Sequence, residues 1–208
     1  MDWTRQFDSY CERVDFTYWS EPVNAVTNAA FNIAALIMWR RAEGSLWGRV
    51  LCAVLFAIGA GSYLFHTHAT VWAVTADVVP IGVFILVYLF LVHWHVVGLR
   101  LLWALGATAL FVPFAAVFVP VMDMLPFFRI SNFYWTVPLL LLVFAPFLRG
   151  RYPGTARCFV IGAAILSLSI TLRSVDAPVC DALPLGTHFL WHILNGIMLG
   201  WMIEVYLR

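Results

Sequence analysis

The sequence contains no lysine: arginine supplies all twelve basic residues of the 208-residue chain. A retinal pigment holds its chromophore as a Schiff base on a lysine amine, so this absence excludes a rhodopsin-type function. Charge of either sign is also scarce, at 11% of residues, whereas 63% are hydrophobic and the mean hydropathy is +0.89. These values lie outside the usual range of soluble domains and predict an integral membrane protein. The net charge of +1 gives no reason to propose a nucleic acid partner.

The sequence also lacks a cleavable signal peptide, because its start is polar and acidic and has no apolar core. We expect residues 1–19 to form a polar, acidic N-terminal cap on a single membrane domain that spans residues 1–208. After the cap, seven apolar runs are long enough to cross a bilayer as helices. They cover residues 20–39, 50–68, 71–97, 101–119, 131–148, 156–172 and 186–207. The predicted fold is an all-α membrane protein, a bundle of seven transmembrane helices.

The arginines are unevenly distributed between the two sides that seven crossings would create. Eight would lie on one side and four on the other, the four being Arg5, Arg13, Arg129 and Arg173. Basic residues accumulate on the cytoplasmic side of membrane proteins. This rule places the N-terminus outside and the C-terminus in the cytoplasm.

Cysteine is infrequent, with four residues in the chain. Cys52 and Cys158 fall within apolar runs, so we expect them to be small buried residues. Cys11 and Cys180 fall in loops that the predicted topology places on the same side of the membrane. A disulfide between them is compatible with this placement, although the sequence does not fix the distance between their Cα atoms.

Four ionisable side chains interrupt the apolar runs at a similar predicted depth, within one or two turns of the outer boundary: His66, Asp77, His188 and His192. Such groups are costly inside a membrane and indicate a functional site that faces the interior of the bundle. The spacing of four places His188 and His192 on one helix face, as two ligands of one metal ion require. With His66 they supply the three protein ligands of a hydrolytic Zn²⁺ site, whose fourth position is left to water.

Two further polar residues lie close to the predicted metal ligands in the sequence. Ser62, one turn before His66, would either donate a hydrogen bond to the attacking water or the developing oxyanion, or be a small residue that allows close helix packing. Asp77 would either transfer the proton from water to the leaving amine or orient a histidine ring. Both are therefore candidate catalytic residues.

The spacing of Ser62, His66 and Asp77, followed by the pair His188 and His192 on the last of seven helices, resembles the alkaline ceramidase family. This family belongs to a wider group of seven-helix hydrolases that also contains the adiponectin and progestin receptors. The resemblance covers nearly the whole chain. It implies hydrolysis of ceramide or a related N-acyl lipid to a sphingoid base and a fatty acid, with zinc on the three histidines. The partner would be a membrane lipid substrate, and no obligate protein partner is evident.

The same resemblance implies a Ca²⁺ site, formed by the N-terminal segment and the start of the first helix. The candidate ligands carry oxygen atoms, which Ca²⁺ prefers; they are Asp8, Glu12, Asp15, Glu21 and Asn24. The chain departs from the family pattern at Ser9 and Val14, where the family has an aspartate and an asparagine. Asp8 and Asp15 are the expected substitutes, and the alternative is a solvated acidic cap without calcium.

Two other functional classes remain open from the sequence. One is a receptor-like protein that senses a lipid without turning it over. The other is a membrane haem protein that uses the histidines as axial ligands. The all-arginine basic set and the compact chain favour a bacterial inner membrane, with an organelle membrane as the alternative.

Overall fold

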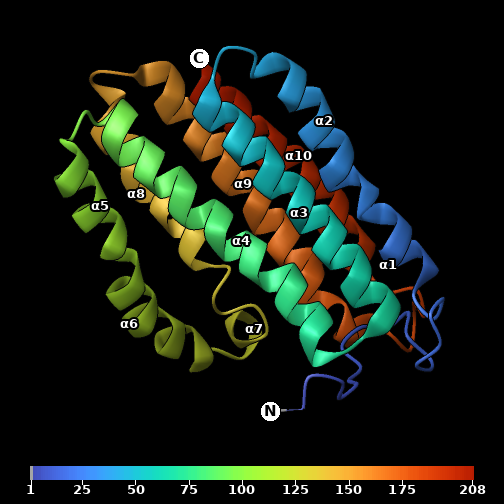
Figure 1. Cartoon of the computed structure of the whole chain (residues 1–208). Helices are drawn as coiled ribbons and strands as arrows, with labels where there is room; N and C mark the ends of the chain where they lie inside the picture. Colours follow the sequence, from blue (N-terminus) through green and yellow to red (C-terminus); the bar gives the residue numbers. More distant parts are fainter. Residues whose placement is uncertain (1) are drawn as a thin grey trace.

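The computed structural model describes residues 2–208, which fold into a bundle of helices (Figure 1). Within this range there is no β-strand, and one isolated antiparallel bridge pairs Gln6 with Thr70. The predicted all-α class is therefore confirmed. The helices are α1 (Pro22–Thr27), α2 (Ala29–Arg41), α3 (Leu46–His68), α4 (Val71–Leu91), η1 (Val92–Val96), α5 (Leu101–Ala109), α6 (Phe111–Asp123), α7 (Pro126–Arg129), α8 (Thr136–Arg149), α9 (Pro153–Val175), η2 (Ala177–Val179) and α10 (His188–Leu207).

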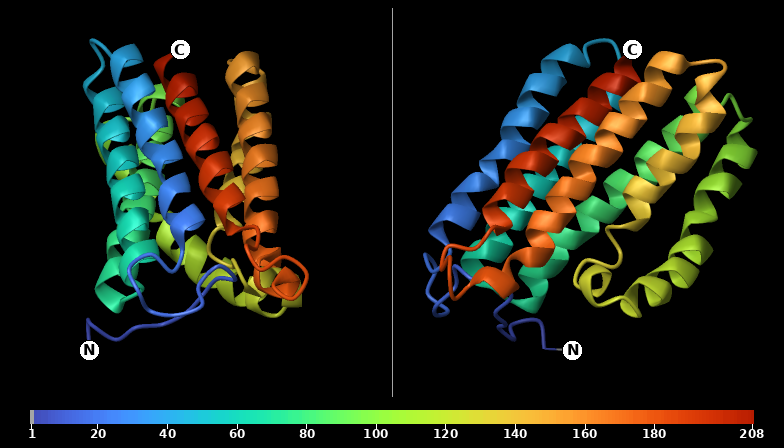
Figure 2. Two further views of the ribbon diagram at one scale, coloured as in Figure 1. Left: turned by 90° about the vertical axis from the view of Figure 1, so that its right-hand side faces the viewer. Right: turned by 180° about the vertical axis from the view of Figure 1, so that it is seen from behind.

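The long helices run side by side and are joined by short turns (Figures 1 and 2). Helix α3 packs against α2 and α4, and the last helix, α10, packs against α2 and α9. Helices α5 and α6 form the outermost rod, next to α4 (Figure 1). The two chain ends lie at opposite ends of the bundle (Figure 2). Because α10 contacts the first helices, residues from the two ends of the sequence meet.

Five helical segments within residues 2–208 are long and apolar enough to cross a membrane: α3, α4 with η1, α5 with α6, α9 and α10. The first expected run, residues 20–39, is not one continuous helix, because it is interrupted at Asn28 between α1 and α2. The Asn28 amide donates to the carbonyl of Asn24 at 2.8 Å, a bond that competes with regular helix formation. The run 131–148 also differs, since α8 begins only at Thr136 and has 14 residues. All seven expected runs thus contain helix, and five of them meet the criteria for a span.

Two glycines, Gly61 and Gly196, allow close contacts between helices. Gly61 of α3 lies against the backbone carbonyl of Ala76 in α4, where any Cβ would overlap that carbonyl. Gly196 of α10 faces the backbone of Ala30 in α2, and a Cβ there would lie 2.9 Å from the Ala30 carbonyl carbon. Small residues at such contacts let helix backbones approach closely within membranes. They hold α3 against α4 and α10 against α2.

The N-terminal segment, residues 2–21, folds over one end of the bundle (Figure 2). Cys11 and Cys180 form a disulfide, which confirms the proposed pairing. The segment is also held by backbone hydrogen bonds, including one from the Phe7 N–H to the Ala69 carbonyl at 3.0 Å. The cap therefore packs directly against the ends of α3 and α10.

The apolar core fills the bundle between the cap and its opposite end. Its most deeply buried side chains come from α3, α4, α9 and α10, and include Leu51, Leu55, Ile58, Leu91, Phe159, Ile170 and Ile203. Cys52 belongs to this core as expected, whereas Cys158 is only partly buried. In a bilayer, close packing rather than exclusion of water holds such a core together.

Candidate metal centre

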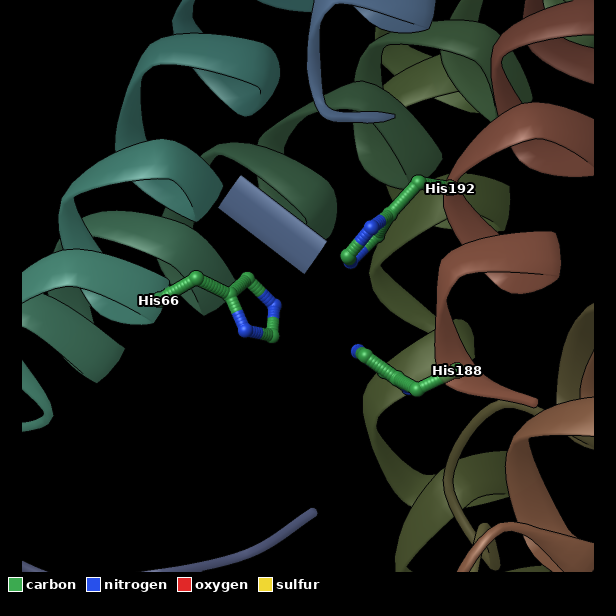
Figure 3. A group of neighbouring side chains, drawn as sticks. All are labelled: His66, His188 and His192. Atoms are coloured by element: carbon green, nitrogen blue, oxygen red, sulfur yellow. The ribbon is translucent and has the colours of Figure 1, made fainter. Parts of the chain in front are cut away.

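Three histidines from distant parts of the chain meet beneath the N-terminal cap. His66 lies in the last turn of α3, and His188 and His192 lie in the first two turns of α10. All three are buried, and their potential ligand atoms lie within 4.8 Å of one another. Figure 3 shows the three rings converging from the two helices on one space. Among residues 2–208, no other group of three His, Cys, Asp or Glu side chains has this arrangement. The predicted histidine cluster is therefore confirmed as a possible metal site.

Hydrogen bonds fix the rings of His66 and His192. His66 donates its Nδ1–H to the Glu21 carboxylate at 2.6 Å, which leaves the lone pair on Nε2. Thr27 donates its hydroxyl hydrogen to the Val23 carbonyl at 2.7 Å, so it accepts the Nδ1–H of His192 at 3.0 Å. Each bond selects the tautomer whose Nε2 is free to bind a metal ion.

Two ring nitrogens of the histidine cluster are buried without hydrogen-bond partners within residues 2–208. Nε2 of His192 and Nδ1 of His188 are buried and have no partner among the described residues. A buried polar atom without a partner is destabilising and calls for an explanation. Three imidazoles, two with the second nitrogen already bonded, form a donor set that fits a divalent metal ion. The unpaired nitrogens support this fit.

A buried arginine supports the Glu21–His66 pair, a contact that the sequence analysis missed. Arg13 forms an ion pair with Glu21, with 2.5 Å between Nε and Oε1. A second guanidinium nitrogen donates to the His66 carbonyl at 2.8 Å, and the third donates to the Asp15 carbonyl at 3.0 Å. Arg13 thus neutralises the carboxylate that orients His66. Its position next to Glu12 in an acidic segment was the only sequence signal for this role.

The five predicted calcium ligands lie in the cap and at the start of α1. Glu12 accepts the N–H groups of Val23 and Asn24 at 2.7 and 2.8 Å, so it caps the start of α1. Asp8 accepts the N–H of Tyr10 at 3.3 Å. The remaining candidates are Asp15, Glu21 and Asn24; Asp15 is exposed, and the other two bond to each other at 3.0 Å.

Several of these oxygens accept hydrogen bonds, but the side-chain oxygen of Asn24 is buried and has no partner among the described residues. The Thr17 hydroxyl and backbone N–H both donate to Asp15, and these bonds lower the pKa of its carboxyl group below the ordinary value. Glu21 is paired with Arg13, whose guanidinium provides the positive charge that a calcium ion would otherwise bring. Calcium binding at these residues stays a prediction, and the unpaired oxygen of Asn24 is an atom that a cation could bind.

Asp176 positions the start of α10 and was also missed from the sequence. One of its carboxylate oxygens accepts the N–H groups of Thr187 and His188 at 2.6 and 2.8 Å, and the other accepts the N–H of Cys11 at 3.0 Å. These bonds satisfy free N–H groups at a helix start, where negative charge is favourable. Asp176 therefore links the cap to the helix that carries two of the histidines.

Tyr10 of the cap packs against the histidine cluster. Its ring stacks on His188 with 3.5 Å between ring centroids. Burial raises the pKa of its phenol, so the group stays neutral at physiological pH. Tyr10 thus contributes a flat, uncharged wall beside the metal ligands.

Ser62 and Asp77 lie close to the histidine cluster but are not part of it. Both line one small cavity of about 50 Å³, together with Trp191 and Asn195. Ser62 is buried and lies one turn before His66 on α3, as expected. Asp77 faces the cavity from α4, and the metal-ligating group does not include it. This placement suits residues that contact a substrate rather than bind the ion.

A second apolar cavity adjoins this one inside the bundle. It has a volume of about 60 Å³, lies farther from the cap and is lined almost entirely by apolar side chains from α4, α8, α9 and α10. The two cavities share four lining residues, Ile85, Val137, Met198 and Leu199. The apolar walls of the two cavities suit contact with hydrocarbon.

The geometry also bears on the haem alternative. The ring centroids of the three histidines lie between 4.6 and 5.1 Å apart. Two axial imidazoles must lie on opposite faces of a planar macrocycle, and rings packed this closely around one point leave no room for that plane. The arrangement therefore favours a single ion.

No protein-family model matches the chain, and no curated protein matches it. The interpretation of the centre therefore depends on its own geometry.

Proposed function

We propose that the protein is an intramembrane, zinc-dependent amide hydrolase of the alkaline ceramidase type. Its substrate would be ceramide or a related N-acyl membrane lipid, cleaved to an amine and a fatty acid. The observation that carries this proposal is the convergence of three buried imidazoles whose ligand atoms lie within 4.8 Å of one another. The chain would cross the membrane seven times, with the N-terminus outside and the C-terminus in the cytoplasm, and a bacterial inner membrane is the expected location.

His66, His188 and His192 would hold the zinc ion, and the fourth position would be open to water and substrate. When bound, zinc would act as a Lewis acid that polarises the amide carbonyl and lowers the pKa of the attacking water to about 7. Glu21 and Thr27 support this role because their hydrogen bonds leave Nε2 of His66 and of His192 free.

The remaining steps fall to Asp77 and Ser62. Asp77 accepts a proton from the water while the water oxygen bonds to the amide carbonyl carbon. It then delivers that proton to the amide nitrogen as the C–N bond breaks. Ser62 donates a hydrogen bond to the carbonyl oxygen while negative charge develops on it. The products are a free amine and a fatty acid. The shared cavity of Ser62 and Asp77 supports this division of roles.

The direct test is hydrolysis of N-acyl lipids by the purified, zinc-loaded protein. We expect release of sphingoid base from ceramide, or of amine from a related N-acyl lipid, detected by mass spectrometry. His192→Ala should abolish the release, whereas His95→Ala should keep it, because His95 bonds to Tyr206 away from the centre. If the protein binds N-acyl lipids but cleaves none of those tested, this result would instead favour the receptor-like alternative.

A further inference from the structure

A polar pocket lies between the N-terminal cap and the reaction site proposed above. It has a volume of about 260 Å³ and is lined by residues of the cap, α3, α4, the segment before α8, and the end of α9. Asp77 and Tyr134 line both this pocket and the apolar cavity that contains Ser62. The two spaces are thus adjacent at Asp77, one with polar groups and the other with apolar walls.

The pocket contains the positive charge of Arg173, which has no acidic partner. No Asp or Glu oxygen lies within 4.0 Å of this guanidinium among the ion pairs of residues 2–208. Its three hydrogen bonds go to neutral acceptors: the Ile130 carbonyl at 3.2 Å, the Ser131 hydroxyl at 2.8 Å and the Tyr10 hydroxyl at 3.2 Å. Nε donates to no described residue. Arginine remains charged in proteins, so the pocket contains a cation with free donors.

Aromatic rings hold this cation in a fixed position. Its central carbon lies 5.1 Å from the ring centroid of Tyr134, 5.7 Å from that of Trp191 and 5.8 Å from that of Tyr10. These cation–π contacts stabilise a guanidinium but do not neutralise it. A partly buried charge without a counter-charge is costly, and a bound anion would remove that cost.

Neither of the two carboxylates that also line the pocket forms an ion pair with Arg173. Asp176 directs its oxygens to the N–H groups of Cys11, Thr187 and His188. Asp77 faces the cavity with Ser62, where the proposed function uses it. Arg173 therefore remains available to an external anion.

We propose that the substrate is an N-acyl lipid whose amine half carries an anionic group, and that Arg173 binds this group while the acyl chain extends toward the apolar cavities. The inference rests on the proposed function and narrows its substrate class. A carboxylate, a sulfonate or a phosphate each supplies the required charge, and guanidinium binds all three through charge-assisted hydrogen bonds. Arg173 is thus a specificity-determining residue.

The test compares two ligands that differ only in charge, N-hexadecanoylglycine and N-hexadecanoylglycinamide. Equilibrium binding is measured in the zinc-loaded Asp77→Asn background, where neither ligand should be cleaved. We expect the anionic ligand to bind about 10- to 100-fold more tightly, the value of a charge-assisted hydrogen bond. Arg173→Gln should reduce this preference to about twofold or less, within the reach of a neutral hydrogen bond. Arg129→Gln, at an exposed site on the same side of the bundle, should keep it.

Further ligands distinguish the source of the charge. N-hexadecanoyltaurine carries a sulfonate and phosphorylated N-hexadecanoylethanolamine carries a phosphate, and the tightest of the three anions identifies the group. Equal binding of the glycine and glycinamide ligands would overturn the proposal. So would an Arg173→Gln variant that weakens both ligands equally, because that result indicates a structural role.

If Arg173→Gln does not fold, Arg173→Lys replaces it in the same comparison. This variant keeps the charge and loses the planar fork, so the anionic ligand should bind more weakly than in the parent while the amide is unaffected. An unchanged affinity for the anion would contradict the assignment. Binding is scored without turnover, so the proposal can hold even if the wild-type protein cleaves none of these lipids, an outcome that would count against the hydrolase alone.

Discussion

The carboxylate of Glu21 accepts the Nδ1–H of His66 over 2.6 Å, and both groups are buried. Glu21 immediately precedes α1, whereas His66 lies at the end of α3, so this bond joins the cap to the metal centre. Arg13 completes the arrangement from the other side of the carboxylate. The orientation of one predicted zinc ligand therefore depends on the fold of the N-terminal segment.

Replacing Glu21 tests this dependence. We expect Glu21→Gln to weaken zinc binding by about 10- to 100-fold, because the ring of His66 loses a charged acceptor. Competition with a chromogenic chelator measures the affinity. Glu43→Gln is the matched control, since Glu43 is exposed. Equal zinc affinities in the two variants would show that Glu21 does not orient the ring.

The ion pair of Arg13 with Glu21 should stabilise the cap. Arg13→Gln should lower the free energy of unfolding by about 3–5 kcal/mol, because it leaves the buried Glu21 charge unpaired. Arg5→Gln, at an exposed side chain, is the control. Equal free energies of unfolding in Arg13→Gln and Arg5→Gln would contradict this account.

Replacing Asp77, the proposed proton-transfer residue, should have a different effect from replacing a metal ligand. We expect Asp77→Asn to keep zinc and to lower kcat by about 10²- to 10⁴-fold, the usual contribution of a general base. Metal analysis and hydrolysis of the same preparation check both parts. Near-normal kcat would remove the proton-transfer role, and loss of zinc would assign Asp77 to ring orientation instead.

The disulfide should stabilise the start of α10 through Asp176. Cys11 and His188 donate their N–H groups to the same carboxylate, so freeing Cys11 from Cys180 loosens both. The double variant Cys11→Ser/Cys180→Ser should lose about 2–5 kcal/mol of stability. It should also release zinc faster into excess chelator.

The control for the disulfide prediction is Cys158→Ser, at a partly buried, unbonded cysteine. Its melting temperature and zinc release should stay close to those of the wild-type protein. If the double variant behaves like this control, the disulfide does not contribute to holding the metal ligands.

The histidine cluster could be predicted from the sequence because two simple rules apply to it. The spacing of His188 and His192 fixes their common helix face, and the cost of polar groups in a membrane directs them toward a partner. His66 was chosen as their partner because it lies at a similar predicted depth in another apolar run, residues 50–68. The disulfide followed from the same topology, since it places Cys11 and Cys180 on one side.

The contacts around the cluster could not be predicted because they depend on how an irregular segment folds. No periodicity indicates that Arg13 reaches Glu21, or that Asp176 caps α10. The sequence also did not show that Glu12 and Asp15 accept hydrogen bonds at a helix start and in a local turn. The break at Asn28 was also missed, although the asparagines were visible in the run.

The central claim is that His66, His188 and His192 together hold one zinc ion, and elemental analysis of the purified protein tests it most directly. The account predicts about one zinc per wild-type chain, the occupancy of a three-histidine site, and the same content in His95→Ala. Replacing all three ligands by alanine should bring the content close to zero. A full equivalent of zinc in the triple variant, or no bound divalent metal in the wild-type protein after zinc loading, would contradict the account.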